Sequence, residues 1–207
     1  MKGLLLKDFY MLGKYCRSFV LILAVFLVVS CFGNDNTFFV IYPVLIAGMI
    51  PVTLISYDER EKWHIYSETL PCTRAQFVSA KYLIGLIFEL TVFLLSAAAQ
   101  AYRMSSAGAF TLTEFLPFVL TLLVTGLIAP ALLLPFIFRL GAEKGRIAYY
   151  VVIGAVCAGG TVFAGSGMKL PEWLKSEWIF VFIALFAVTV YICSWGLSAF
   201  LYNKREL

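Results

Sequence analysis

Long apolar runs, each near the length needed to cross a bilayer, occupy most of this chain. Of its 207 residues, 62% are hydrophobic and only 14% are charged, whereas a soluble domain is about half apolar and about one-quarter charged. A membrane-spanning helix needs about 20 mainly apolar residues, so the length suffices for about six spans with short loops. We therefore expect one all-α, polytopic membrane domain over residues 1–207, without room for a separate soluble catalytic domain.

Short polar or small-residue segments separate the expected spans. The spans cover Ser18–Phe32, Phe38–Tyr57, Arg74–Ala101, Glu114–Phe138, Ile147–Phe163 and Trp178–Tyr202. Prolines inside the second and fourth spans predict bends, because proline removes a backbone hydrogen-bond donor. Before the first span, residues 1–17 interleave apolar and charged side chains. They predict either an amphipathic helix in the membrane interface or a simple basic flank.

The longest polar interruption in the chain is residues 58–81. Asp58 and Glu61 have the spacing of a helix N-cap and the carboxylate three positions later, and Thr73 and Gln76 repeat this capping-box pattern. A proline lies between the two patterns. We therefore predict a short cytoplasmic helix that begins at Asp58, a break at the proline, and a new helix that leads into the third span.

Three large side chains of this stretch fall at helical spacing. Trp63, Tyr66 and Leu70 are expected to line one face of the predicted short helix. Aromatic side chains are common anchors at protein interfaces, and tryptophan and tyrosine also favour the level of the membrane surface. The face is therefore either a docking surface for a protein or a contact with the bilayer.

Lysine and arginine are distributed unevenly along the chain. With the N-terminus inside, the inner segments carry 13 of the 16 basic residues, and the outer segments carry only Arg103, Lys169 and Lys175. Cytoplasmic loops of membrane proteins carry such an excess. We expect a plasma-membrane protein with both termini and the 58–73 loop in the cytoplasm.

The chain offers little enzymatic chemistry. It lacks the G-x-x-x-x-G-K-[ST] phosphate loop, and no two of its five cysteines have the spacing of a ligand pair. Its only histidine, His64, is expected on the inner side, while Ser166 is expected at the outer end of the fifth span. These two residues would be about 30 Å apart, too far for a serine protease. We therefore expect no catalytic residue and no metal site.

Glu89 is the one acidic residue well inside an expected span. A carboxylate within the bilayer is costly, and it normally faces protein or water. One interpretation is a charge that lines a transport pathway. The other is a structural bond to a neighbouring helix.

The fifth expected span carries pairs of small residues four positions apart. The pairs are Gly154 with Ala158 and Ala155 with Gly159. Such a face allows two helices to approach closely in lipid. Small residues are also common in membrane spans, so both a packing face and an ordinary span composition remain open.

The expected topology and two strings of residues resemble the permease subunit of ABC type-2 exporters, in their small six-span branch. The loop of that branch is matched here by Asp58-Glu59, Trp63, Leu70-Pro71, Arg74 and Lys81-Tyr82. A second match is Pro135–Arg146, PFIFRLGAEKGR, which contains Arg139, Gly141, Glu143 and Lys144. The topology covers nearly the whole chain, and the residue-level match covers about two dozen positions.

The resemblance implies two permeases, identical or paralogous, that work with two separate ATPase subunits. ATP and Mg would be bound by the ATPase, and no cofactor by this chain. The loop with Asp58, Glu59, Trp63, Tyr66, Leu70, Pro71 and Arg74 would be the coupling element. Relatives of this branch export amphipathic or antimicrobial peptides or confer resistance to them, so we expect a peptide substrate and no nucleic-acid partner.

Within such a dimer, two copies of Glu89 on the dimer axis would form an acidic pair that attracts cationic peptides. The first and fifth spans are the expected dimer interface. The alternative to a transporter is a membrane anchor or sensor partner that binds another protein and transports nothing.

Overall fold

The computed structural model describes residues 2–15, 17–32, 38–63, 66, 73–106, 108, 111–148, 150–151 and 177–204, and no strand occurs within these ranges. The helices are α1 (Lys2–Tyr15), α2 (Arg17–Phe32), α3 (Phe38–Gly48), α4 (Ile50–Arg60), α6 (Arg74–Ser106), α7 (Leu112–Leu140) and α9 (Glu177–Asn203). The expected all-α class is therefore confirmed for the described part of the chain.

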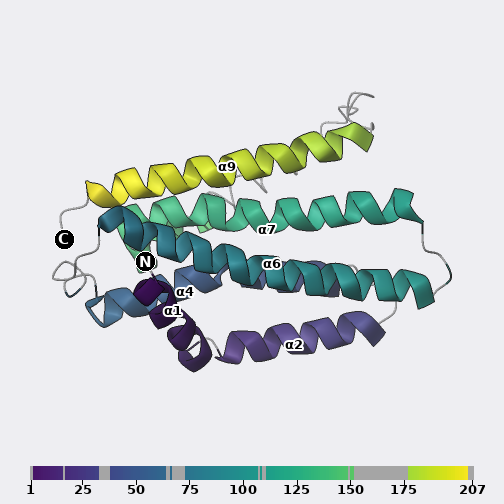
Figure 1. Cartoon of the computed structure of the whole chain (residues 1–207), viewed down its shortest axis with the longest axis horizontal. Helices are drawn as coiled ribbons and strands as arrows, with labels where there is room; N and C mark the ends of the chain where they lie inside the picture. The colour runs from purple at the N-terminus through teal and green to yellow at the C-terminus, as the bar shows by residue number, and fades with distance from the viewer. Residues whose placement is uncertain are drawn as a thin grey trace.

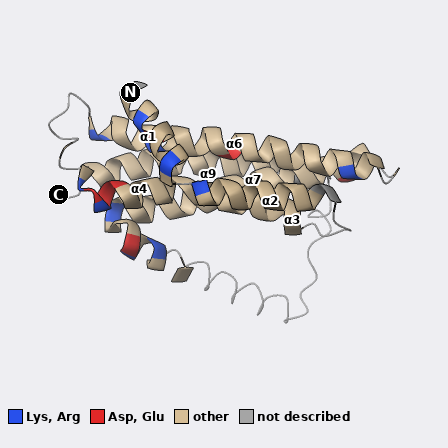
Figure 2. Cartoon of the chain, turned by 90° about the horizontal axis from the view of Figure 1, so that it is seen from below, with Lys and Arg blue, Asp and Glu red and all other residues tan. Residues whose placement is uncertain are grey.

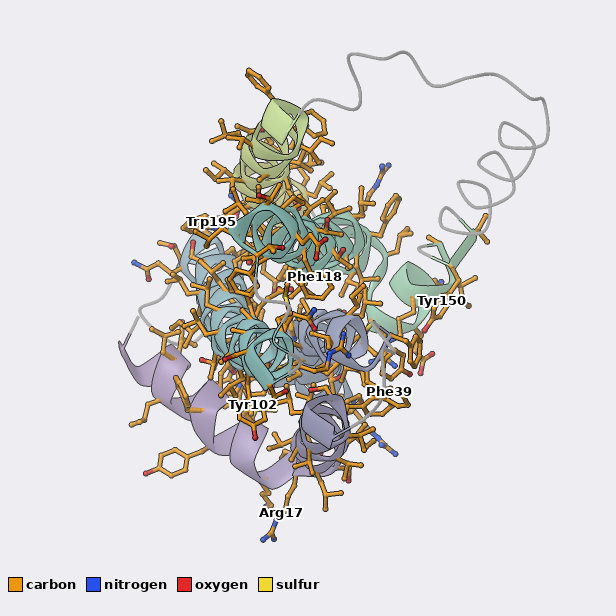
Figure 3. All side chains as sticks on the ribbon, turned by 90° about the vertical axis from the view of Figure 1, so that its right-hand side faces the viewer. Arg17, Phe39, Tyr102, Phe118, Tyr150 and Trp195 are labelled. Carbon is orange, nitrogen blue, oxygen red and sulfur yellow. The ribbon has the colours of Figure 1, made fainter. Side chains whose placement is uncertain are left out.

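The long helices run side by side along one axis (Figure 1). α9 packs most extensively on α7, and α6 packs on α3 and α9. The start of α1 and the end of α9 lie at the same end of the bundle (Figure 1). Seen along the helices, Arg17 at the start of α2 lies on the side opposite α9 (Figure 3).

Four helical segments of the described chain are long and apolar enough to cross a membrane. They are Phe38–Arg60, Arg74–Ser106, Leu112–Leu140 and Val181–Asn203, with a fifth if α1 and α2 together count as one bent span. Most of the expected span Ile147–Phe163 lies outside the described residues. The structure therefore supports a polytopic membrane protein, and the count of six stays a prediction.

Residues 2–15, for which the sequence leaves an amphipathic interfacial helix and a basic flank open, form helix α1. Its axis makes an angle of 70° with that of α2. Leu4 and Leu12 are buried, whereas Leu6, Phe9 and Tyr10 are more than half exposed. A helix with one buried edge and a second apolar edge at the bundle surface is suited to the membrane interface.

The second expected span is broken into α3 and α4 at Met49. Pro51 occupies the first turn of α4, where its missing N–H costs no helical hydrogen bond. The break coincides with close contacts between helices: a Cβ on Gly48 would lie 3.2 Å from Pro130 Cδ, and one on Gly85 would lie 3.0 Å from Pro51 Cγ. Glycine thus lets α7 and α6 approach the break.

The predicted helix start at Asp58 is wrong. α4 continues to Arg60, so Asp58 lies in its last turn. After Pro51 the helix has no breaker before this point, and its hydrogen bonds continue to Glu61 N–H, which donates to Tyr57 O at 3.0 Å. Lys62, with φ 52°, marks the turn after the helix end.

The second capping box is confirmed. Gln76 N–H donates to Thr73 Oγ1 at 3.2 Å, and Thr73 N–H donates to Gln76 Oε1 at 3.3 Å. The reciprocal pair satisfies two donors that a helix start leaves free. The new helix therefore begins where the sequence predicts, and α6 continues from it without interruption.

The polar segment between the expected spans Glu114–Phe138 and Ile147–Phe163 is mostly helical in the structure. Gly141 ends α7 with φ 88°, a conformation that favours glycine, and residues 142–148 are helical again. Gly145 packs so closely on α7 that an added Cβ would lie 2.7 Å from Ile137 Cα. The chain therefore folds back tightly instead of forming an open loop.

Hydroxyl groups join α6, α7 and α9 inside the bundle. Ser194 Oγ donates its one hydrogen to Ala131 O at 2.6 Å. It therefore accepts the hydrogen bond from Tyr82 Oη at 2.8 Å. Tyr82 Oη in turn accepts from Ser198 Oγ at 2.7 Å. Tyr191 Oη donates to Tyr82 O at 3.0 Å. The chain of hydrogen bonds fixes the register of the three helices.

Replacing the central hydroxyl of this network tests its contribution. Tyr82→Phe should lower the free energy of unfolding by about 1 kcal/mol, because Ser198 loses a buried acceptor. Thermal unfolding of the purified protein in detergent measures the effect. Tyr102→Phe is the matched control, since Tyr102 is 61% exposed. Equal melting shifts in both variants would contradict a structural role for the network.

Candidate functional site

Two lysines and two aspartates meet at the end of the bundle where α1 crosses it. Lys7 and Asp8 come from α1, Asp58 from α4 and Lys81 from α6. Lys7 Nζ donates to Asp58 Oδ1, and Lys81 Nζ donates to Asp8 Oδ1 at 2.7 Å and pairs with Asp58 Oδ2 at 2.5 Å. Asp8, Asp58 and Lys81 are each at most 3% exposed. We call these four residues the charge cluster.

The charge cluster has balanced charges but little access to water. The ring of Trp63 covers it from one side, with its centroid 4.2 Å from Lys7 Nζ. The pKa of the Lys7 ammonium is lowered, first by burial and then by the charge of Lys81. Asp58 and Asp8 act in the opposite direction but do not outweigh these causes. Buried charges persist only when they are paired. The cluster therefore fixes α1 to the ends of α4 and α6.

Glu59 links the end of α4 to the segment after α7. Its Oε2 accepts a hydrogen bond from Ala142 N–H at 2.7 Å. Ala142 is the first residue of the helical stretch 142–148, so the carboxylate lies at a helix N-terminus, where negative charge is favourable. The end of α4 and the segment after α7 are therefore in direct contact.

An open depression of about 610 Å³ lies beside this contact. Glu59 and Gly141 are among its lining residues, and Arg60, Glu143 and Lys144 line it with exposed side chains. Charged residues gather at this end of the bundle around α1 and α4, and few lie along the helices (Figure 2). The depression is thus a polar surface formed by two segments that are distant in sequence.

The structure describes only the Trp63 and Tyr66 part of the predicted aromatic face. Trp63 is partly buried over the charge cluster, and Tyr66 is 55% exposed, with ring centroids 5.1 Å apart. Leu70 and Pro71 lie outside the described residues. Trp63 therefore packs within this chain, and Tyr66 is the aromatic residue of the pair that reaches the surface.

Two further predicted residues lie near the same end. Arg74 Nη1 donates to Asn203 O at 3.4 Å, which ties the start of α6 to the end of α9. Arg139 is exposed in the last turn of α7. The predicted helix-packing residues Gly154, Ala155, Ala158 and Gly159 lie outside the described part of the chain.

Glu89 is 4% exposed and lies beside Gly126 of α7, so it faces a neighbouring helix. Whether it also lines a transport pathway stays a prediction. Within the described residues, no hydroxyl or basic group hydrogen-bonds its Oε1. The carboxyl instead borders an apolar cavity between α6, α7 and α9.

Sequence reasoning missed the partners of Asp58 and the serines of the α9 network. Lys7, Asp8 and Lys81 each adjoin apolar runs, and opposite charges at such borders are a usable signal for pairing. Ser194 and Ser198 are four residues apart in an apolar span, so they share a helix face. In lipid, serines on one face indicate hydrogen bonds between helices.

The apolar helices with a charged end define a polytopic helical membrane protein. The family model described as "ABC-2 family transporter protein" matches residues 3–203, and the chain belongs to this family. No curated protein and no solved structure matches the chain. The membership of this chain in the ABC-2 family supports the interpretation that it is a membrane subunit of an ABC transporter.

The charge cluster should dominate the stability of the charged end. Asp58→Asn leaves two lysines with one buried aspartate, and should lower the free energy of unfolding by about 3–5 kcal/mol. Adding Lys7→Gln restores the charge balance and should recover part of the loss. Thermal unfolding in detergent measures both, with exposed Glu114→Gln as control. A double variant no more stable than Asp58→Asn alone would contradict the pairing.

Proposed function

We propose that this protein is the translocating subunit of an ATP-driven exporter and works as a dimer with separate ATPase subunits. The observation that carries the proposal is the family match over residues 3–203. The sequence has no phosphate loop of its own, which supports hydrolysis of ATP with Mg by a partner. The second permease is a copy of this chain or a paralogue, as the resemblance implies.

The charged end of the bundle is the cytoplasmic end in this proposal. Lysine and arginine concentrate in the segments assigned to it, as the positive-inside rule requires of a plasma-membrane protein. The N-terminal end of α1 and the C-terminal end of α9 lie there together (Figure 1). An ATPase in the cytoplasm would meet this end.

The proposed ATPase-docking surface comprises Arg60, Glu143 and Lys144, which line the 610 Å³ depression, and Tyr66, which lies six residues after Arg60 in the chain. All four side chains are exposed. The bond from Ala142 N–H to Glu59 makes the two segments around the depression one unit. A force on this surface would therefore reach α4 and α7 together, and through the charge cluster also α1 and α6.

The proposed cargo is an amphipathic or antimicrobial peptide, and this rests on the resemblance of the 58–82 string to the peptide-exporting branch. The alternative function is a membrane anchor or sensor partner without transport. Co-purification with an ABC ATPase whose hydrolysis rises with a peptide would support export. A stable complex without such stimulation, and without export in vesicles, would favour the anchor.

Reversing two charges tests the docking surface. Glu143→Lys combined with Lys144→Glu keeps the net charge but exchanges the two signs. Mismatched charges at an interface cost a few kcal/mol, so the amount of co-purified ATPase should fall about tenfold or more. Glu114→Lys, exposed at the other end of the bundle, is the control. ATPase retained at the parental level by the double variant would reject this surface.

The two aromatic residues after α4 should behave differently. Tyr66→Ala should weaken ATPase association and leave the melting temperature unchanged, because Tyr66 is exposed. Trp63→Ala should lower the melting temperature, because it uncovers Lys7 in the charge cluster. Pull-down and thermal unfolding on the same preparations separate the effects. Tyr66→Ala with full association would remove Tyr66 from the proposed surface.

A further inference from the structure

An apolar cavity of about 320 Å³ lies between α6, α7 and α9, near the middle of these long helices. Leu90 of α6 and Ile192 of α9 line it and are 46% and 59% exposed, so the cavity opens on the side of the bundle. Its volume falls in the range of small-molecule sites, about 300–1,000 Å³. The cavity is distinct from the depression at the charged end.

One carboxyl borders this apolar space. Glu89 is 4% exposed, and its Oε1 has no hydrogen-bond partner within the described residues. Gly126 makes the room for it, because a Cβ there would lie 2.5 Å from Glu89 Oε1 and 2.8 Å from Val44 Cγ1. An unpartnered carboxyl at such depth is costly unless a ligand supplies a donor or a positive charge.

The other polar atoms of the cavity wall have partners elsewhere. Tyr191 Oη donates to Tyr82 O at 3.0 Å, and Trp195 Nε1 donates to Ser79 Oγ at 3.1 Å. Their rings remain as wall surface together with Phe93. The site thus combines one acidic group with aromatic rings, and aromatic faces attract cations.

We propose that this cavity binds a compact apolar amine, with its ammonium group against the Glu89 carboxyl and its hydrocarbon part against the aromatic wall. A cation fits better than a neutral donor, because it balances a carboxylate in a low-dielectric site and also gains from the rings. The ligand enters from the side, between Leu90 and Ile192. The binding does not depend on the proposed ATPase docking, so either can fail alone.

The test compares an amine with a neutral molecule of the same shape. The full-length protein in lipid nanodiscs is titrated with 1-aminoadamantane or 1-adamantanol by equilibrium dialysis, with empty nanodiscs subtracted. The amine should bind saturably and more tightly than the alcohol. Glu89→Gln should weaken amine binding about tenfold or more, since it removes a buried charge, and leave alcohol binding unchanged.

A second variant locates the binding without disturbing the core. Ile192→Trp at the exposed rim should narrow the entrance and weaken binding of both molecules, and Glu114→Gln at the bundle end should change neither. Melting temperatures of each variant are measured on the same preparations. The proposal is overturned by parental amine affinity in either Glu89→Gln or Ile192→Trp, and equally by the absence of saturable binding to the parent.

Discussion

The pairing of two lysines with two aspartates in a largely buried site constrains this structure more than any other interaction. Three separate helices supply the four charges, so none can move without exposing or stranding a charge. The cluster places α1 across the end of the bundle, and it sets the end of α4 beside the start of α6. The Glu59 bond to Ala142 extends the same unit to α7.

The middle of the bundle is held by different means. Glycine faces proline where α3 and α4 meet α7 and α6, and a chain of hydroxyls joins α6, α7 and α9. Tyr191 and Trp195 use their polar atoms in or beside this network, and their rings form a wall of the Glu89 cavity. The same residues therefore rigidify the bundle and shape its apolar cavity.

Local patterns in the sequence predicted the local structure well. The Thr73 and Gln76 capping box was identified because its bonds span three residues, and four of the expected spans were identified because their apolar runs are continuous. The predicted helix start at Asp58 was wrong because the local pattern fits an N-cap, whereas the partners of Asp58, Lys7 and Lys81, lie far away in sequence. Glu89 was recognised as unusual, but its cavity depends on α7 and α9, which no pattern around residue 89 reveals.

The separation of the paired charges along the chain affects how the protein is made. Asp8 and its partner Lys81 are 73 positions apart, so the ribosome synthesises Asp8 long before Lys81. During that interval the N-terminal helix must keep its charges in water at the headgroup level, because isolated charges do not enter hydrocarbon. Insertion of the third hydrophobic segment then completes the site. α1 can therefore complete its charge pairing only after α6 has been inserted, although it is synthesised first.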